Sequence, residues 1–294
     1  MSLLRLPLAI LAAIAGQALL VATDADAQRR YDDRYDREYD RGYGNQDRGY
    51  DSRDRGYDNR SQRNVAGQFD YYALVLSWSP THCATSNKPG DDMQCNRDDG
   101  RRYNFVLHGL WPQYDRGYPN DCPTRDRPFV PNNVIDKMLE IMPAKGLIIH
   151  EYRKHGTCSG LDPARYFDLA RQLYNRIHIP ERYLNPFDEQ FVTPEELLRE
   201  MTAANPELKP DMLAIACGGP GNRLKEIRIC FTKDGQLRSC GHNENQRRMC
   251  SARQIYVPPV RSTWQDPRGG STNNRRGQEK QLPQQKDFLP GPRI

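Results

Sequence analysis

The sequence predicts an α+β fold, with a central sheet rich in antiparallel pairs, several flanking helices and a framework of disulfides. Segments typical of strands and of helices are mixed along the chain, without the regular strand–helix–strand alternation of a parallel sheet. The chain also has eight cysteines, all of which follow an N-terminal segment typical of an export signal. An even number of cysteines in an exported chain indicates disulfides.

The individual elements follow from local patterns. Strands are predicted where β-forming or apolar residues gather, at 69–78, 103–107, 212–216 and 226–231. Helices are predicted at 132–141 and at 163–177, where apolar residues recur with helical spacing. Another helix should begin at Thr193-Pro194-Glu195-Glu196, which forms a capping box with proline at the first helical position.

The cysteines are Cys83, Cys95, Cys122, Cys158, Cys217, Cys230, Cys240 and Cys250. No CxxC pair occurs among them, which argues against a metal site, but their count alone leaves the pairing open. Asp234-Gly235 is typical of a hairpin turn. A three-residue loop at 234–236 would place Cys230 opposite Cys240, where the two could bridge the hairpin.

Residues 1–27 are predicted to be a signal peptide. Arg5 supplies a positive charge, Leu6–Val21 is an uncharged apolar run, and Ala25-Asp26-Ala27 offers small residues for cleavage. A membrane anchor is the alternative, but the apolar run is too short for one. We therefore expect an exported protein, periplasmic or secreted, with no membrane association after the signal is cleaved.

The rest of the chain should hold one folded domain between two polar segments. Hydrophobic residues make up 37% of the chain and charged residues 28%, which is too polar for folding throughout. Residues 28–67 form a tether rich in Tyr, Arg, Asp and Gly, the folded domain spans 68–260, and 261–294 form a polar tail. Both polar segments are expected to be disordered. The tether is either a solvated spacer or a segment that binds RNA or other tethers through Arg and Tyr.

Two segments suggest chemistry, and the first is Phe105–Pro112. A strand leads to His108 at its end, and Gly109 leaves the backbone open for close approach. Trp111 follows three residues after the histidine. Taken alone, a histidine and a tryptophan near a strand end are more often packing residues.

The second segment, His150–Cys158, follows three apolar residues. At about 100° per residue, an α-helix would gather two histidines, a carboxylate and an ammonium within about 140° of its circumference: these are His150, His155, Glu151 and Lys154. A solvated charged face is the alternative, but it would not need two histidines. A zinc-protease helix needs histidines at i and i+4, and here Lys154 stands at i+4. No metal is expected.

These side chains fit cleavage of RNA through its own 2′-hydroxyl. A base must remove the 2′-OH proton, an acid must protonate the departing 5′ oxygen, and positive charge must stabilise the phosphorus centre. Two histidines with pKa values of about 6.5 can serve as base and acid. Lys154 can bind the phosphoryl oxygens, Glu151 can orient a histidine and raise its pKa, and Trp111 can stack on a base. The net charge of +5 permits an anionic partner without requiring one.

Together the two segments closely resemble the active-site segments of the ribonuclease T2 family. His108-Gly109-Leu110-Trp111-Pro112 is similar to the first block of the family. His150–Cys158, with the pattern His-Glu-aromatic-x-Lys-His-Gly-Thr-Cys, is similar to the second. Phe69–Tyr72 with Leu76–Pro80 is similar to the opening strand of the family. The likeness covers roughly residues 68–256.

The resemblance implies an endoribonuclease that cuts single-stranded RNA with low base specificity and without a cofactor. The reaction would pass through a 2′,3′-cyclic phosphate to a 3′-phosphate. Carried over by position, the catalytic residues are His108, Glu151 and His155, and the phosphate-binding residues are His150 and Lys154. We favour His155 as the base and His108 as the acid, because the helical projection places Glu151 on the face of His155.

The resemblance also implies four disulfides: Cys83–Cys95, Cys122–Cys158, Cys217–Cys250 and Cys230–Cys240. The sequence departs from the family at two positions of its active-site segments. Gln113 stands where many members have an acidic residue that helps to form a base pocket, which leaves base preference open. Tyr152 stands where tryptophan is frequent, a change expected to affect packing.

Two other classes of function remain open. A catalytically silent, exported RNA-binding protein could share the fold, although all five active-site side chains are present. A structural protein of the cell envelope could instead work through the tether. Single-stranded RNA is the expected partner, and the protein is expected to be a monomer.

Overall fold

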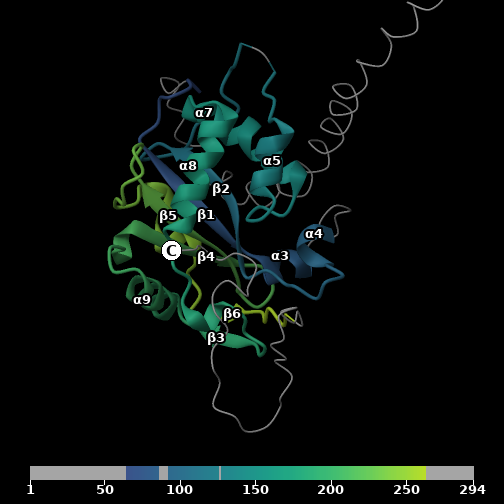
Figure 1. The fold of residues 1–294 in the computed structure, drawn as a ribbon. Helices are drawn as coiled ribbons and strands as arrows, with labels where there is room; N and C mark the ends of the chain where they lie inside the picture. Colours follow the sequence, from purple (N-terminus) through teal and green to yellow (C-terminus); the bar gives the residue numbers. More distant parts are fainter. Residues whose placement is uncertain (1–63, 86–91, 126, 263–294) are drawn as a thin grey trace, which may run out of the picture. The chain divides into compact units, whose positions relative to one another are not determined.

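The computed structural model describes residues 64–85, 92–125 and 127–262 (Figure 1). The predicted signal peptide, residues 28–63 of the predicted tether and residues 263–294 of the predicted tail lie outside the described residues. In chain order the elements are β1 (Tyr71–Trp78), α3 (Ser79–Thr85), α4 (Asp92–Cys95), β2 (Phe105–Gln113), α5 (Asn132–Met138), α6 (Lys145–Glu151), the π-helical turn η1 (Tyr152–Gly156), α7 (Thr157–Ser159), α8 (Pro163–Asn175), η2 (Glu181–Tyr183), β3 (Gln190–Val192), α9 (Pro194–Ala204), η3 (Pro210–Met212), β4 (Leu213–Gly218), β5 (Arg223–Phe231), η4 (His242–Glu244), α10 (Gln246–Met249) and β6 (Ile255–Val257).

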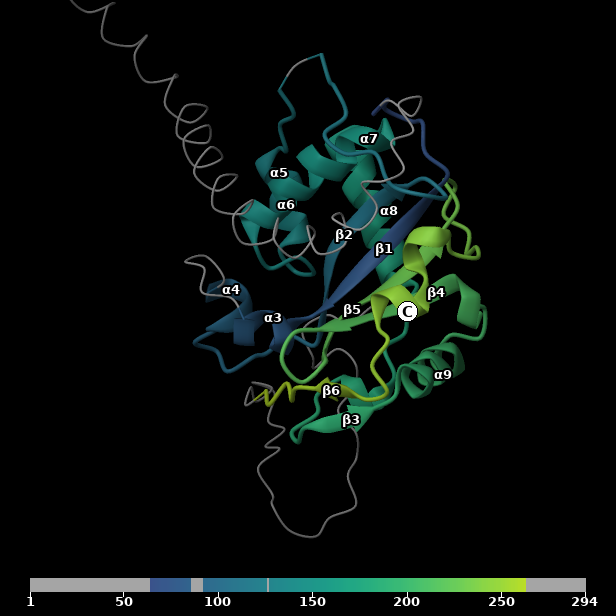
Figure 2. The same ribbon diagram turned by 180° about the vertical axis from the view of Figure 1, so that it is seen from behind.

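The predicted α+β class is confirmed. Six strands form one sheet in the order β2-β1-β5-β6-β3, and β4 pairs with β5 outside this path. Within the described chain all strand pairs are antiparallel except that of β5 with β6. In Figures 1 and 2, α8 lies near β1 and β2 and α9 lies near β4, and Figure 2 also shows α6 near β2. The two segments with predicted chemistry therefore meet where α6 and η1 pack on β2.

Helix α8 packs on β2, which lies at one edge of the sheet. The Tyr166 hydroxyl donates to the Leu110 carbonyl at 2.8 Å, and the Tyr174 hydroxyl donates to the Phe105 carbonyl at 3.2 Å. Both tyrosines are fully buried, so their hydroxyls need these acceptors. The bonds also satisfy carbonyls of an edge strand and fix the helix on it.

Strand β2 differs from its prediction, because it continues through His108 to Gln113 instead of ending at residue 107. Val75 of β1 pairs with Gly109 and Leu76 pairs with Leu107, so His108 is the extra residue of a β-bulge. A bulge bends a strand and redirects a side chain. The bulge therefore presents His108 from the middle of a strand. Pro112 does not end the strand because prolines are tolerated at sheet edges.

The helix predictions are correct in type and differ at the ends. Helix α5 ends at Met138 and α8 at Asn175, two or three residues before the predicted ends. The predicted capping box is confirmed at the start of α9. The Thr193 hydroxyl accepts from the Glu196 N–H at 3.0 Å, and the Glu196 carboxylate accepts from the Thr193 N–H at 2.8 Å.

The hairpin after β5 has a different register from the predicted one. Phe231 pairs with Leu237, so the loop spans 232–236 instead of 234–236. The hydroxyl of Thr232 accepts from the Gln236 N–H at 3.0 Å, and this bond closes the longer loop. Cys230 consequently lies near Arg238, whose N–H donates to the Cys230 carbonyl at 3.1 Å.

Four disulfides link the cysteines in the pairs that the resemblance implied: Cys83–Cys95, Cys122–Cys158, Cys217–Cys250 and Cys230–Cys240. The second pair ties the loop after β2 to α7, at the end of the helical segment that carries His155. Next to it the Asp121 N–H donates to the Lys154 carbonyl at 2.8 Å. This disulfide therefore links the loop that follows the first segment with predicted chemistry to the end of the second.

We expect the double variant C122S/C158S to lose about 4 kcal/mol of unfolding free energy, because the open chain regains the entropy of a loop of 36 residues. Urea unfolding of the variant and the parent measures this loss. The variant C83S/C95S, which opens a loop of only 12 residues, is the matched control and should lose less. Equal unfolding midpoints for parent and C122S/C158S would contradict the stabilising role of this bond.

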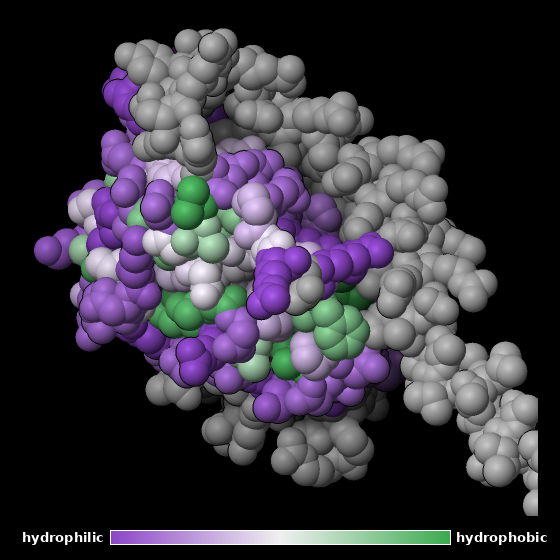
Figure 3. All heavy atoms as spheres, turned by 90° about the horizontal axis from the view of Figure 1, so that it is seen from above, coloured by the Kyte–Doolittle hydropathy of each residue, from purple (hydrophilic) through white to green (hydrophobic). Residues whose placement is uncertain are grey.

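The described part of the chain exposes few large hydrophobic side chains. The face in Figure 3 is mostly hydrophilic, with small separate hydrophobic patches among the residues drawn in colour. Among the residues with described side chains, those that are large, hydrophobic and exposed are Val65, Met93, Phe129, Phe187 and Phe191. Between residues 64 and 262, as far as they are described, no helix has the length and apolarity to cross a bilayer.

Candidate active site

The second chemical segment forms a helix whose middle turn is π-helical. His150 and Glu151 end α6, whereas Lys154 and His155 lie in η1. A π turn is closed by i→i+5 instead of i→i+4 hydrogen bonds, so the projection at 100° per residue is wrong beyond Glu151. In the wider turn, residues five positions apart lie closer to the same face of the helix. The charge of His150 accordingly acts on His155.

Gly156 lets the widened turn pack. A Cβ at this position would overlap the ring of Tyr152. Tyr152 in turn contacts α8, with its ring centroid 5.8 Å from that of Tyr166 and 6.2 Å from that of Phe167. These contacts hold η1 against α8, which agrees with the expected packing role of Tyr152.

Glu151 joins the two chemical segments. Its side chain is 2% exposed; Oε2 accepts from Trp111 Nε1 at 2.6 Å, and Oε1 lies 3.6 Å from His108 Nε2. Gly109 makes this approach possible, because a Cβ there would overlap Glu151 Oε2 and lie 2.6 Å from Trp111 Nε1. Glu151 thus contacts His108 and Trp111. The helical projection had placed Glu151 on the face of His155, so that projection does not support the choice of His155 as the base.

Both histidines of the predicted acid–base pair lie against Trp111. The His155 ring stacks on the indole at a centroid distance of 5.0 Å and 25° between planes. The His108 ring meets the indole edge to face at 5.2 Å and 73°. The positive charge of His108 also acts on His155. The two imidazoles therefore belong to one site.

The indole of Trp111 is itself largely enclosed. It is 5% exposed, and besides both histidines it contacts the guanidinium of Arg228, whose Cζ lies 4.7 Å from the ring centroid. Stacking of a base on Trp111 stays a prediction. A base would meet only the small exposed part of the ring.

The surroundings of His155 favour its neutral form. Burial lowers the pKa of His155 well below the usual 6.5. Positive charges act in the same direction, in the order Lys154, His150, His108 and Arg228. His150 is 8% exposed and Lys154 half-buried. A neutral imidazole beside several cations can accept a proton close to a bound anion.

Comparison with known proteins agrees with this geometry. The model of the Ribonuclease T2 family matches residues 69–240, a range that includes both chemical segments. The chain belongs to the ribonuclease T2 family. A ribonuclease of Aeromonas hydrophila is 48% identical to it over 201 residues, which cover 62% of this chain and 81% of that protein.

Two solved structures share the fold of this T2 chain. An RNase-related protein from Calystegia sepium superposes with a TM-score of 0.50 at 22% identity and covers 66% of this chain and 98% of its own. Trichomaglin, described as a novel S-like ribonuclease, superposes with a TM-score of 0.54 at 22% identity and covers 66% and 99%. At this identity the likeness concerns the fold alone.

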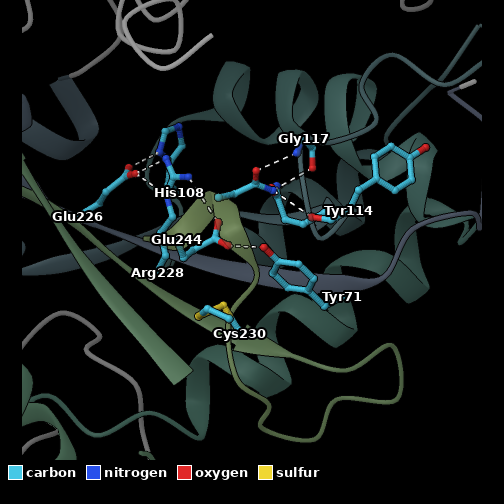
Figure 4. A network of polar contacts seen from close by, with 11 residues as sticks. Tyr71, His108, Tyr114, Gly117, Glu226, Arg228, Cys230 and Glu244 are labelled. Carbon is cyan, nitrogen blue, oxygen red and sulfur yellow. Dashed lines mark hydrogen bonds and ion pairs between the residues drawn. A yellow bond between two sulfur atoms is a disulfide. The ribbon is translucent and has the colours of Figure 1, made fainter. Parts of the chain in front are cut away.

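Sequence reasoning missed two residues of this T2 site, Glu226 and Arg228 of β5 (Figure 4). Oε2 of Glu226 lies 3.6 Å from His108 Nδ1, and Arg228 binds Oε1 of Glu226. One sequence feature could have drawn attention to them: a glutamate and an arginine stand two residues apart in a strand that was predicted to be buried. Residues at this spacing lie on the same face of a strand. The sequence did not reveal that β5 lies close to His108.

The loop after β2 completes the surroundings. Gln113, expected to affect a base pocket, is 2% exposed, and its Oε1 accepts from Asn243 Nδ2 at 2.8 Å. Asn243 also exchanges hydrogen bonds with the main chain of Gly117. The amide of Gln113 therefore helps to hold this loop.

The same loop brings a further ring to the site. The ring of Tyr118, which sequence reasoning did not single out, lies 6.4 Å from that of His155 and is half-buried.

The described residues contain one group with the composition of a metal site, Cys230, Cys240 and Glu244. The two sulfur atoms are bonded to each other in a disulfide. A disulfide sulfur has no thiolate to offer a metal, so this group does not fit a metal ion.

Proposed function

We propose that this protein cleaves single-stranded RNA through the 2′-hydroxyl of the substrate, with His155 as the base and His108 as the acid. As a member of the ribonuclease T2 family it is an RNA-cleaving endoribonuclease. One observation carries the assignment of roles: the two histidines have opposite surroundings. His155 is buried among positive charges, whereas His108 lies between the carboxylates of Glu151 and Glu226.

The first step forms a cyclic phosphate. Neutral His155 takes the proton of the 2′-hydroxyl, and the 2′ oxygen attacks the phosphorus. The bond from phosphorus to the 5′ oxygen breaks, and protonated His108 gives its proton to that oxygen. In the second step water opens the 2′,3′-cyclic phosphate, with the proton transfers reversed, to leave a 3′-phosphate. A histidine buried among cations and a histidine between two carboxylates suit this exchange of roles.

Positive charge from the helical segment stabilises the reacting phosphate. Lys154 and His150 bind the phosphoryl oxygens, and support for their proximity comes from their charges, both of which lower the pKa of His155. A developing negative charge gains most from fixed cations in a site that excludes water. Trp111 contacts both imidazoles, and the small exposed part of its ring contacts a base. Base specificity is low, as the resemblance to the family implies, and the buried amide of Gln113 is occupied by its hydrogen bond with Asn243.

Export to the periplasm or the medium completes the proposal. The segment 1–27 has the pattern of a cleavable signal. Four disulfides in the folded domain support an oxidising compartment.

The test uses the purified mature protein and a DNA oligonucleotide with one ribonucleotide, in excess EDTA. We expect a single cut, 3′ of the ribonucleotide, whose new end is first a 2′,3′-cyclic phosphate and later a 3′-phosphate. The same oligonucleotide with a 2′-O-methyl group is the matched control and should stay intact. No cleavage of the first substrate would favour the silent RNA-binding protein. Cleavage that EDTA abolishes and a divalent cation restores would overturn the metal-independent mechanism.

A further inference from the structure

We infer that Glu226, held by Arg228, is a positioning residue for His108, fixing its ring so that Nε2 presents the proton given to the leaving group. The inference rests on the proposed function, since it requires His108 to be the acid. Glu226 lies outside the two segments that resemble the family, on the distant strand β5. Neither the sequence motifs nor the comparisons point to it.

The two nitrogens of His108 face different carboxylates. Nδ1 lies 3.6 Å from Oε2 of Glu226, and Nε2 lies 3.6 Å from Oε1 of Glu151. These are ion-pair distances for a protonated ring. A carboxylate at one nitrogen of a histidine sets which nitrogen keeps its proton. With Glu226 holding the proton on Nδ1, Nε2 is the nitrogen that exchanges a proton on the side of Glu151, Trp111 and His155.

Arg228 fixes the carboxylate of Glu226. Its Nε and one terminal nitrogen both bind Oε1 of Glu226, at 2.8 and 2.7 Å, so that Oε2 is left to face His108 (Figure 4). Paired contacts from one guanidinium restrict a carboxylate more than a single bond does. Pairing within the sheet brings these groups to the site: Val75 of β1 pairs with Gly109 of β2 on one side and with Arg228 on the other.

Arg228 is held in turn from further inside the protein. It is 8% exposed and lies 3.6 Å from Oε1 of Glu244, which is 4% exposed and whose other oxygen accepts from the Tyr71 hydroxyl. The guanidinium also lies over the indole of Trp111. Successive contacts therefore close a ring: His108, Glu226, Arg228, Trp111, Glu151 and back to His108. Such a ring gives the imidazole one orientation.

Glu226 keeps its charge over the working pH range. Burial raises the pKa of Glu226, but Arg228 and His108 outweigh burial and bring it to about 2. Glu151 from α6, Glu226 from β5 and His155 from η1 act on His108, and Arg228 lies on the other side of the Glu226 carboxylate. Without the negative charge of Glu226, repulsion from the neighbouring cations makes the protonated form of His108 less stable. The acid would then lose its proton at a lower pH.

The test is the pH profile of E226Q with a dinucleotide substrate. Activity falls on the alkaline side when the acid loses its proton, so we expect this limb to move down by about one pH unit. The value of kcat near neutral pH should fall by about tenfold to a hundredfold, and KM should stay within about twofold. The acid limb, set by His155, should stay in place.

Two further variants separate positioning from stability. E244Q changes a carboxylate of the same buried network that contacts Arg228, and its alkaline limb should move much less than that of E226Q. E226Q/R228Q removes both charges of the pair and so keeps the net charge of the parent. Its alkaline limb should nevertheless stay displaced toward lower pH. If E226Q and E244Q both lower the melting temperature and neither moves the limb, Glu226 has only a structural role.

A substrate with p-nitrophenol as leaving group adds a readout that a structural role would not move. This leaving group needs no acid, so E226Q should approach the parent rate with it. An equal loss with both substrates would overturn the inference. The variant H108A distinguishes a failure of the proposed function from a failure of the inference about Glu226. If H108A cleaves the dinucleotide normally, the proposed function itself fails; if H108A is inactive while E226Q keeps the parent profile, only the inference fails.

Discussion

Replacing His108 or His155 with alanine is expected to lower the rate of RNA cleavage by about a thousandfold, because each variant loses one of the two proton transfers. His155 contributes the neutral base, since burial and neighbouring cations lower its pKa. His108 contributes the acid between two carboxylates. Initial rates on a defined single-stranded RNA measure the loss.

Thermal unfolding of the same samples shows whether the variants fold. His155 stacks on Trp111 and is 3% exposed, so its removal leaves a cavity that costs stability. H178A is the matched control, because His178 lies after α8 and outside the site. We expect H178A to keep the parent rate. A folded H108A or H155A protein with near-normal turnover would be incompatible with the acid–base pair.

Replacing Gly109 with alanine is expected to lower kcat/KM by about a hundredfold, although it adds only one methyl group. The new Cβ would overlap Glu151 Oε2 and crowd Trp111 Nε1, so the 2.6 Å hydrogen bond between these residues must break. Glu151 then loses its position beside His108, and displacements of this size are costly for catalysis. Steady-state kinetics on the dinucleotide measure the effect.

The control for this variant is G218A on β4. A Cβ at Gly218 meets the side chain of Lys225, with its Cε at 3.2 Å and its Nζ at 3.3 Å, and these flexible atoms can move aside. G218A should therefore keep nearly full activity. Full activity of G109A would mean that the contact between Glu151 and Trp111 is not needed for catalysis.

The parts of the site that the sequence could predict are those built from contiguous segments. His108 and Trp111 share one strand, and His150 to His155 share one helical stretch, so spacing alone brought most of the chemistry together. Two local features escaped. The β-bulge at His108 depends on the pairing of β2 with β1, and the π turn breaks the α-helical periodicity on which the projection relied.

Glu226 and Arg228 could not be assigned to the site for a different reason. Their place depends on the strand order β2-β1-β5, which brings together residues more than a hundred positions apart in the sequence. A charged pair in a strand predicts a polar spot on one face of a sheet but does not identify its neighbour. The hairpin register was missed because the side chain of Thr232 closes a longer loop than the Asp-Gly turn suggested.

The most direct test of the acid–base pair compares H108A and H155A on two substrates, a dinucleotide and the matching nucleoside 3′-p-nitrophenyl phosphate. Departure of p-nitrophenol needs no acid, whereas removal of the 2′-OH proton still needs a base. We predict that H108A recovers most of its rate on the ester and that H155A stays inactive. Recovery of H155A alone would reverse the two roles, and failure of both variants on the ester would contradict the assignment of His108 as the acid.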